Sequence, residues 1–224
     1  MKKYEFTGET KAFNGTTLHR IRALKDFGDV AAGDLGGWIE KEENLSHDGG
    51  CWVYGNAQVF GNAQVFGDAR VAGDAWVYGN AHVYGNAQVY GNAQVYGNAQ
   101  VFGDAQVFGD ARVSGNARVY GNAQVSGYAQ VSGYARVFGD ARVAGDAEIK
   151  APKDTFWISA IGSRYGTTTF FRCADGKVRV TCGCFYGDLD EFAAKVQETH
   201  GDNKHGKVYK KLIELAKIQM EEDI

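Results

Sequence analysis

The chain has a single proline, no long apolar run and no marked excess of charge of either sign. Its 224 residues carry 24 Lys and Arg against 27 Asp and Glu, a net charge of −3. This balance predicts no nucleic-acid partner, because nucleic-acid binding needs a basic surface. No stretch reaches the roughly 18 apolar residues of a membrane span, so no membrane partner is expected. The first ten residues lack the apolar core of a signal peptide, which predicts a cytoplasmic protein.

Glycine is abundant where proline is scarce. The chain has 31 Gly and 1 Pro, which argues against a disordered linker and indicates a turn that recurs and needs glycine. Of the four cysteines, Cys51 stands alone, and Cys173, Cys182 and Cys184 lie late in the chain. Without a secretion signal, we expect all four to be reduced thiols.

One pattern of six residues repeats without interruption across residues 51–150. A β-branched residue recurs at every sixth position from Val53 to Ile149, and no hexad carries an insertion or a deletion. Alanine lies four residues after each valine, glycine lies two residues after it, and Asn or Asp follows the glycine except at Tyr128 and Tyr134. Such a repeat predicts a solenoid.

The spacing within each hexad predicts short strands joined by corners. Ala and Val are two residues apart, so in a strand they point to one side and their neighbours point to the other. The Gly-Asn pair tolerates left-handed backbone angles and is suited to a corner. A period of six does not keep one face of a helix, which turns every 3.6 residues. Three hexads close a coil of 18 residues, and the seventeen hexads predict a mainly β fold, a three-sided parallel β-helix of about six coils.

The repeat resembles the hexapeptide-repeat superfamily of left-handed parallel β-helices across residues 51–150. The preceding stretch resembles the YdcK-like hexapeptide proteins that prophages and enteric bacteria carry, through Gly-Gly-Trp at residues 36–38 and Gly-Gly-Cys-Trp at residues 49–52. The resemblance implies left-handed coiling, a bacterial host cell and a phage or prophage setting. It implies no activity, because the family is named as transferases on its fold alone. Periodicity by itself also allows a right-handed three-sided solenoid.

Three regions are expected along the chain. Residues 1–50 should form an N-terminal cap, residues 51–151 the β-helix, and residues 152–224 a C-terminal module of a β-meander and two helices. The last boundary is placed just before Pro152, because this proline breaks the pattern where the repeat stops.

Within the module, a hairpin should turn at Asp175-Gly176. Strands are expected at residues 156–161, 167–173 and 178–184. The expected pairing places these side chains on one face: Phe171, Cys173, Val178, Val180, Cys182 and Cys184. Arg172 and Arg179 would then lie on the opposite face.

Two helices should complete the module. Asp188 is expected to cap the first, with Glu191 completing a capping box, and this helix should end at Gly201. The second is expected from about Lys204 to Glu221. A sheet with two helices of this size can just form a core of its own.

No catalytic residue, metal site or cofactor is predicted. Hexapeptide acyltransferases use a histidine base and a loop that leaves the prism. Here His82 is the single histidine of the repeat and no hexad carries a loop, so His82 is interpreted as a replacement for one glutamine. Cys182 and Cys184 alternate like residues of a buried strand, and the late cysteines match no standard zinc spacing.

Two groups of residues are candidate binding sites. One is a column of aromatic residues that a coil of 18 would stack on one side: Phe66, Tyr84, Phe102, Tyr120 and Phe138. It is interpreted first as a subunit interface, with docking of the C-terminal module or stacking of sugars or bases as alternatives. The other group could bind an anion, with solvated surface charges as the simpler interpretation: Arg164, Arg172, Arg179 and His200.

The repeat without loops favours a non-catalytic scaffold or interaction protein of phage or prophage type. In this hypothesis a rigid solenoid presents the C-terminal module for partner or ligand binding. A homo-oligomer, either trimer or dimer, is expected, and a host or phage protein is a candidate partner. The alternatives are an acyltransferase-like enzyme that works at a groove between subunits, and a phage accessory (anti-defence) protein that binds a host protein or a small nucleotide.

Overall fold

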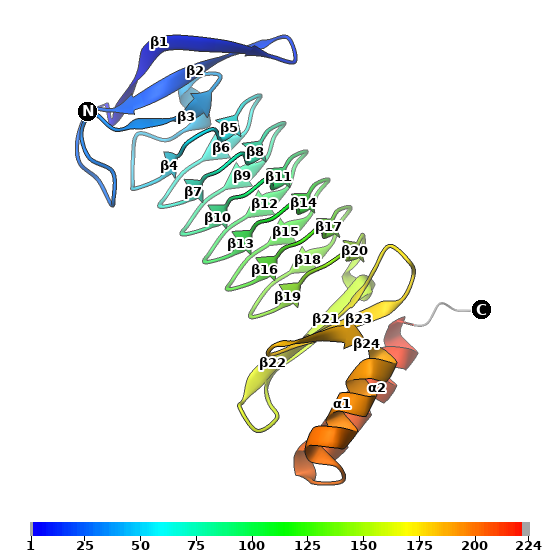
Figure 1. The fold of residues 1–224 in the computed structure, drawn as a ribbon. Helices are drawn as coiled ribbons and strands as arrows, with labels where there is room; N and C mark the ends of the chain where they lie inside the picture. The colour runs from blue at the N-terminus through cyan, green and yellow to red at the C-terminus, as the bar shows by residue number, and fades with distance from the viewer. Residues whose placement is uncertain (1, 221–224) are drawn as a thin grey trace.

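The computed structural model describes residues 2–220, and strands dominate it (Figure 1). At the N-terminal end lie β1 (Tyr4–Phe13), β2 (Thr16–Ala23), β3 (Leu35–Ile39) and the 3-10 turn η1 (Glu42–Asn44). The middle consists of β4 (Trp52–Val53), β5 (Gln58–Val59), β6 (Gln64–Val65), β7 (Arg70–Val71), β8 (Trp76–Val77), β9 (His82–Val83), β10 (Gln88–Val89), β11 (Gln94–Val95), β12 (Gln100–Val101), β13 (Gln106–Val107), β14 (Arg112–Val113), β15 (Arg118–Val119), β16 (Gln124–Val125), β17 (Gln130–Val131), β18 (Arg136–Val137), β19 (Arg142–Val143) and β20 (Glu148–Ile149). At the C-terminal end lie the 3-10 turn η2 (Pro152–Asp154), β21 (Thr155–Ile161), β22 (Gly166–Arg172), β23 (Val178–Cys182), β24 (Phe185–Asp188), α1 (Leu189–His200) and α2 (Lys204–Met220). No helix within residues 2–220 is long and apolar enough to cross a membrane.

Strands β4 to β20 form a three-sided parallel solenoid, as the repeat predicts. Each strand pairs in parallel with the strand one coil later, so that Val53 lies beside Val71 and Val83 beside Val101. The three sides are a six-stranded sheet (β4 to β19), a five-stranded sheet (β6 to β18) and a nine-stranded sheet that β1, β2 and β3 extend at the N-terminal end. The prediction of a mainly β fold with an 18-residue coil is therefore confirmed.

The interior of the solenoid contains the alanine and valine columns. Val101 and Ala105 are both 0% exposed, and the members of the two columns elsewhere along the solenoid are buried to the same degree. Glycine is required at the corners, where Gly103 has a φ of +72°. A Cβ atom at Gly103 would lie 3.0 Å from the backbone nitrogen of Gly121 in the next coil. The corner therefore needs glycine both for its backbone angle and for its close approach to the coil beside it.

Asparagine and aspartate after the corner glycines connect successive coils. The Asn62 side chain donates a hydrogen bond to Asn80 (3.2 Å), and Asn80 donates to Asn98 (3.1 Å). On another corner the Asn86 amide donates to the Asp104 carboxylate at 2.9 Å. These ladders stabilise the stack of coils in addition to its backbone hydrogen bonds.

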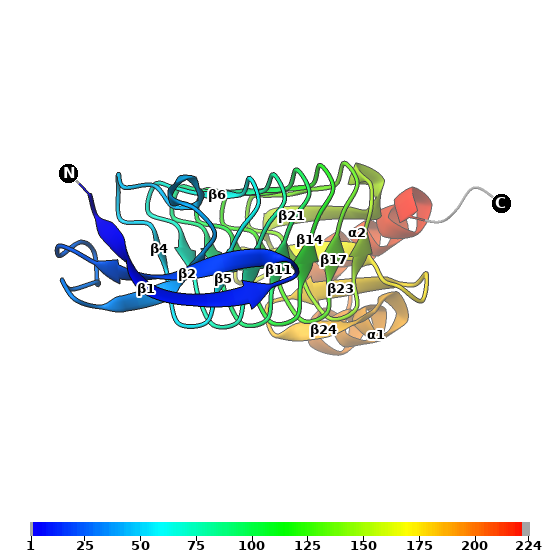
Figure 2. The ribbon, with the colours of Figure 1, turned by 90° about the horizontal axis from the view of Figure 1, so that it is seen from above.

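The N-terminal region covers the first coil. Strands β1 and β2 form an antiparallel hairpin that β3 joins to the solenoid through β5, and Figure 2 shows this hairpin lying over the solenoid near β5. Near its tip, Phe13 packs edge-on against Phe60 and Trp76, with ring centroids 5.6 and 4.9 Å away. The hairpin therefore covers both the end of the solenoid and part of one side.

Gly36 and Trp52, one from each motif of the lead-in, pack together beneath this hairpin. Trp52 is 1% exposed. A Cβ atom at Gly36 would lie 2.6 Å from the Trp52 ring and 2.5 Å from Ile21. A side chain at Gly36 is excluded because β2 and β4 approach β3 so closely there.

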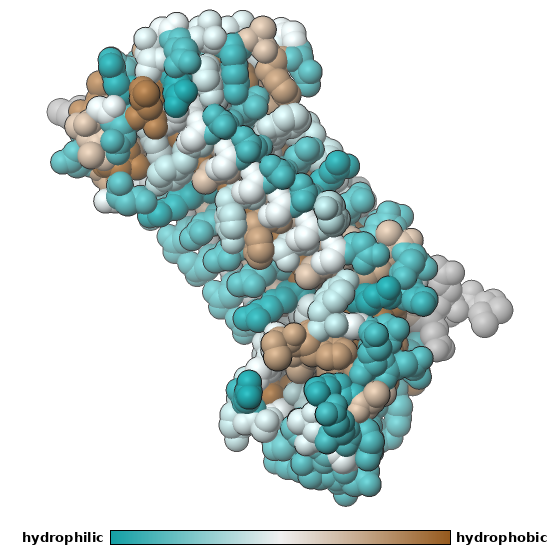
Figure 3. Space-filling view, in the orientation of Figure 1, coloured by the Kyte–Doolittle hydropathy of each residue, from teal (hydrophilic) through white to brown (hydrophobic). Residues whose placement is uncertain are grey.

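The four-stranded sheet β21 to β24 closes the other end of the solenoid. One of its faces packs on the last coil and the other packs on α1 and α2, as Figure 1 shows. Consecutive residues of β22 point to the two sides: Phe171 joins the solenoid core, and Phe170 joins the core beneath the helices, both at 0% exposure. In Figure 3, hydrophobic residues gather at this junction and at the N-terminal cap, with a more polar surface between them.

Hydrogen bonds fix the module to the last coil. The Thr181 hydroxyl donates to the carbonyl of Arg142 at 2.8 Å, and the Arg142 amide donates to the Thr169 hydroxyl at 3.0 Å. The Ala174 amide donates to the carbonyl of Asp146 at 3.0 Å. The module therefore covers an edge that would otherwise leave unpaired strand groups.

The expected pairing of the module's hairpin is wrong by one residue of register, so the prediction of which side chains share a face is also wrong. Phe171 pairs with Arg179, and Phe170 pairs with Val180, so Phe171 and Arg179 share a face instead of lying on opposite faces. A shift of one residue in a strand register moves every side chain to the other side. Residues 183 and 184 also form a turn to β24, a strand that the sequence pattern did not indicate.

The two helices agree with their expected boundaries. The Asp188 carboxylate accepts hydrogen bonds from the amides of Asp190 and Glu191, and the Glu191 side chain accepts one from the Asp188 amide. This is the expected capping box, and α1 ends at His200. Helix α2 runs from Lys204 to Met220; the last residue of its expected range, Glu221, lies outside the described residues.

Candidate functional site

The aromatic column lies on the outer side of the five-stranded sheet, in the stacking that the 18-residue coil predicts. Its members are Phe66, Tyr84, Phe102, Tyr120 and Phe138. Consecutive rings are 4.8 to 4.9 Å apart and within 5° of parallel. The spacing equals that of the strands beneath, because each ring stands on the strand of one coil.

Trp157 ends the aromatic column at the C-terminal module. Its ring stands perpendicular to Phe138, with centroids 4.4 Å apart. The module therefore touches the column only through its end, so the structure does not support docking of the module along the whole column. The column's role as a binding surface stays a prediction.

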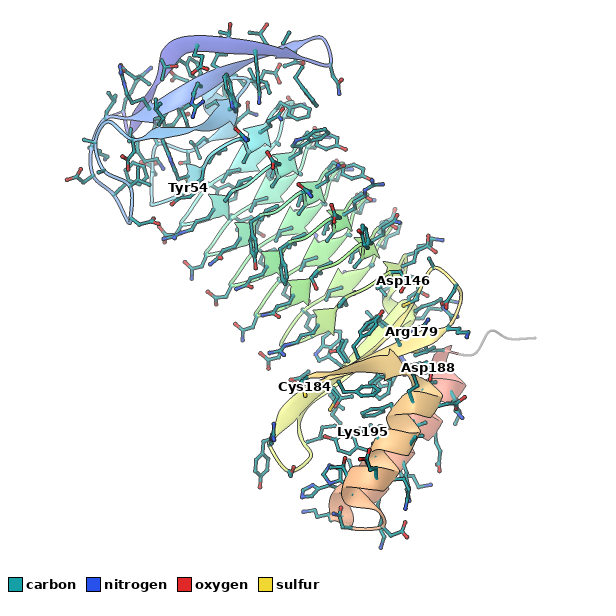
Figure 4. All side chains as sticks on the ribbon, in the orientation of Figure 1. Tyr54, Asp146, Arg179, Cys184, Asp188 and Lys195 are labelled. Carbon is teal, nitrogen blue, oxygen red and sulfur yellow. The ribbon has the colours of Figure 1, made fainter. Side chains whose placement is uncertain are left out.

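Two of the four candidate anion-binding residues of the module are engaged at separate places. Arg172 donates hydrogen bonds to the carbonyls of Gly176 and Met220 and lies 3.8 Å from the Asp154 carboxylate. Arg179 pairs with Asp175 at 2.9 Å, near the last coil (Figure 4). These contacts assign structural roles to both arginines, and the four candidates do not form one cluster.

Arg164 and His200 do lie together, at a pocket in the module. The pocket has a volume of about 350 Å³ and lies between the turn after β21, the turn between β23 and β24, and α1. Lys195 of α1 and Cys184 of the second turn also line it, and Figure 4 marks both. The sequence pattern missed Lys195, because a lysine on a helix is indistinguishable from a solvated one until the fold places it.

The pocket combines an apolar floor with a cationic rim. Four side chains contribute the floor: Phe185, Phe192, Val196 and Tyr209. His200 stacks on the Tyr209 ring, with centroids 5.7 Å apart. Lys195 pairs with the exposed Glu198 at 2.9 Å, whereas Arg164 makes no ion pair within residues 2–220. A ligand with an apolar body and an acidic group fits this arrangement.

The thiols differ in their surroundings. Cys184 is exposed at the pocket, and Cys173 is buried at the junction with the solenoid. Burial, together with a hydrogen bond to Asp146, raises the pKa of Cys173 to about 12. Burial also raises the pKa of Cys51, and the pKa of Tyr209 to about 12, so the Tyr209 phenol is protonated at neutral pH. Cys184 is therefore the thiol suited to report on the pocket.

Alkylation of Cys184 should reveal the charge of the rim. Arg164 and Lys195 attract anions. We therefore expect the ratio of the iodoacetate rate to the iodoacetamide rate to be higher at Cys184 than at free cysteine in solution. Arg164→Ala should lower that ratio by about threefold, as should added salt. Peptide mass spectrometry locates the alkylated residue, and Cys51 and Cys173 should stay unlabelled until unfolding.

The matched control for this measurement is Arg112→Ala, which removes the same charge from an exposed position on β14 of the solenoid. It should leave the ratio unchanged. Equal ratios for the protein and its Arg164→Ala variant would contradict a cationic rim.

The solenoid itself shows no second arrangement of reactive groups. His82 points outward from β9 and meets the edge of Phe66, with centroids 6.4 Å apart. No group of three or more His, Cys, Asp or Glu side chains within residues 2–220 is placed to hold a metal ion.

Comparisons with known proteins concern the solenoid. The family model described as the YdcK beta solenoid repeat matches residues 63–79, 87–103, 93–109, 105–118, 111–127 and 117–133. The repeat region is a YdcK-like hexapeptide-repeat β-helix. This confirms the family resemblance of the repeat, and it concerns neither the N-terminal cap nor the C-terminal module.

A curated protein of Escherichia coli (strain K12), named "Uncharacterized acetyltransferase YdcK", is 44% identical to this chain over 62 residues. The match covers 24% of this chain and 19% of the YdcK protein. The chain therefore matches about a fifth of its curated relative's length, and the similarity supports the β-solenoid rather than an activity.

Proposed function

We propose that this chain is a non-catalytic scaffold or interaction protein, in which the YdcK-like solenoid presents the C-terminal module for partner or ligand binding. The observation that carries the proposal is the uninterrupted solenoid from β4 to β20. A catalytic pocket on such a prism needs a loop or an irregular coil to enclose substrate. This solenoid instead repeats two-residue strands and glycine corners along its length.

The close junction supports a fixed display of the module. Phe171 is 0% exposed against the solenoid core, and Thr169 and Thr181 both hydrogen-bond to Arg142 of the last coil. A flexible linker would allow the module to reorient, whereas this junction ties its sheet to the stack of coils. The solenoid then sets the distance between the N-terminal cap and the module.

The pocket at Arg164, Lys195 and His200 is the site proposed to receive the ligand. The pocket lies on the surface of the module. Its cationic rim favours an acidic group and its aromatic floor favours an apolar one. An acidic segment of a partner protein with an apolar side chain has both features. The partner would be a host or phage protein in the cytoplasm of a bacterial cell, which is the setting that the family resemblance implies.

The second candidate is an acyltransferase-like enzyme, which the name of the YdcK relative, an uncharacterized acetyltransferase, favours. An enzyme of this kind would bind an acyl donor such as acetyl-coenzyme A at a groove between subunits. His82 would be the base available on the solenoid. It lies beside Phe66 on an open side, without a loop to enclose a substrate.

Acetyl-coenzyme A separates the two candidates. For a scaffold, acetyl-coenzyme A should not raise the melting temperature. A ligand at 100 times its dissociation constant stabilises a protein by about 2.7 kcal/mol, which for this size raises the melting temperature by roughly 5–10 °C. Differential scanning fluorimetry measures the shift. A rise of that size that persists in an Arg164→Ala variant, and so does not come from the module's pocket, would overturn the scaffold proposal in favour of the enzyme.

A further inference from the structure

The five-stranded side of the solenoid presents a long aromatic surface to solvent. Phe66 and Phe138, at its two ends, are 36% and 39% exposed, and the three rings between them are partly exposed. Stacking hides the ring faces but leaves an outer edge of each ring open. An apolar strip that runs the length of a side is unfavourable in water and is typical of an interface.

The outward column on which the rings stand extends by one position at each end. At the N-terminal end this position is Ser46, whose amide donates to the carbonyl of Val65 as the Phe66 amide does to that of Val83 one coil later; the neighbouring Leu45 faces the solenoid core at 0% exposure. At the C-terminal end, Trp157 packs on Phe138, one position after the last ring. Phe102 is therefore the midpoint, with two rings between it and either end. A two-fold axis that lies in the interface, parallel to the strands and level with Phe102, would bring Ser46 of one copy opposite Trp157 of the other.

The shapes of the two ends are complementary under this axis. The end at Ser46 has an open cavity of about 460 Å³, whose lining includes Glu42, Glu43, Ser46, His47 and Phe66. The other end carries the half-buried indole of Trp157, which stands perpendicular to the column. A large aromatic ring entering a cavity is the arrangement that dominates the energy of many interfaces.

The charges of the two ends are also complementary. Beside the rings runs a second outward column, which is uncharged at its start and basic at its end: Gln64, His82, Gln100, Arg118 and Arg136. Arg118 and Arg136 are exposed and make no ion pair within residues 2–220. The cavity end carries Glu43, which is exposed and makes no ion pair in the described chain. An antiparallel arrangement brings Arg136 toward Glu43 of the second copy, whereas a parallel one brings arginine toward arginine.

The corner beside the rings does not affect the choice between a parallel and an antiparallel arrangement. Its residues alternate between aspartate and asparagine: Asp68, Asn86, Asp104, Asn122 and Asp140. The order is the same when it is read from either end, so this corner favours neither direction. The direction depends on the arginines and on the cavity.

We infer that this side is the interface of a symmetric, antiparallel dimer of this chain, centred on Phe102. The two aromatic columns face each other, and Trp157 of each copy enters the cavity at Ser46 of the other. The inference is independent of what the module binds. It extends the scaffold proposal, since the two solenoids run in opposite directions and the dimer carries its two modules at opposite ends.

Charge exchange tests the interface and its direction together. The strip is about 29 Å long, six steps of about 4.8 Å, and one ring wide, so it lies at the small end of protein interfaces and we expect a weak dimer. Arg136→Glu should weaken the dimer by at least about tenfold, and Glu43→Arg should do the same. The double variant Arg136→Glu/Glu43→Arg should recover dimerisation to within about threefold of the unaltered protein, because each new glutamate meets a new arginine. Sedimentation velocity over a concentration series measures each constant.

Arg112→Glu is the matched control, because it reverses an exposed arginine on the nine-stranded side. It should leave the dissociation constant unchanged, and all variants should retain the melting temperature of a folded chain. A monomer across the whole series, a trimer, or a double variant as weak as the single ones would each overturn the antiparallel dimer. So would an effect of Arg112→Glu equal to that of Arg136→Glu.

Discussion

Val101→Asp is expected to unfold the solenoid, whereas Gln100→Asp, one residue earlier, should leave it folded. Val101 is 0% exposed in the interior column, and no cation lies among the alanines and valines around it. A carboxylate placed there must lose its hydration without gaining a partner, which costs several kcal/mol. We expect the free energy of unfolding to fall by roughly 4 kcal/mol or more.

Gln100 is the matched control because it belongs to the same strand and points outward. An aspartate there stays hydrated and lies in the same column as Arg118, so the change should be below about 1 kcal/mol. Urea denaturation followed by circular dichroism measures both variants. Equal destabilisation by the two would contradict the alternation of inward and outward residues on which the fold depends.

The solenoid could be predicted from the sequence because one local rule repeats. A strand places residues two apart on one side, and glycine with asparagine makes a corner, so a period of six determines both the coil and the stacking. The aromatic column followed directly: Tyr84 and Phe102 are one coil apart, and their rings lie 4.9 Å from each other. In this region the local preferences and the final packing agree.

The C-terminal module was harder to predict because each element occurs once. The hairpin at Asp175-Gly176 was found, but its facing depended on one residue of register, and the position of Phe171 against the solenoid core decides that register. The sequence alone contains no information on a contact between residues so far apart in the chain. Strand β24 was missed for a similar reason, since Phe185–Asp188 is short and forms only beside β23.

The candidate site was predicted in part. Arg164 and His200 were named together with Arg172 and Arg179, and only the first two line the pocket. Charge type alone could not separate them, because Arg172 and Arg179 are engaged by Asp154 and Asp175 in the fold. Lys195 joins the pocket through the position of α1, which no local pattern specifies.

Removing one whole coil should move the module closer to the cap without turning it. Deletion of residues 86–103 joins Gly85 to Asp104 and preserves the order Val-Tyr-Gly-Asp-Ala. Because neighbouring coils make the same contacts throughout, the shorter solenoid should fold, with stability lowered by one coil-to-coil contact. The distance along the axis should fall by one strand spacing, about 4.8 Å.

Deletion of a single hexad, residues 86–91, is the matched control. It also leaves a continuous repeat, but each later strand then lies on the next side of the prism. The module should therefore turn by a third of a revolution about the axis, and the aromatic column should be interrupted. The two deletions separate the effect of length from the effect of orientation.

Electron–electron distance measurement between spin labels near the two ends tests directly whether the solenoid is a rigid spacer. Labels at Lys25→Cys and Glu198→Cys, in a background with Cys182→Ser and Cys184→Ser, report the distance from cap to module. With the labelled chain diluted in an excess of unlabelled chain, so that a dimer carries labels on one chain only, we predict one narrow distance distribution that keeps its width and shifts by up to about 5 Å when residues 86–103 are removed. A broad distribution in the full chain, or an unchanged mean after the deletion, would contradict the account.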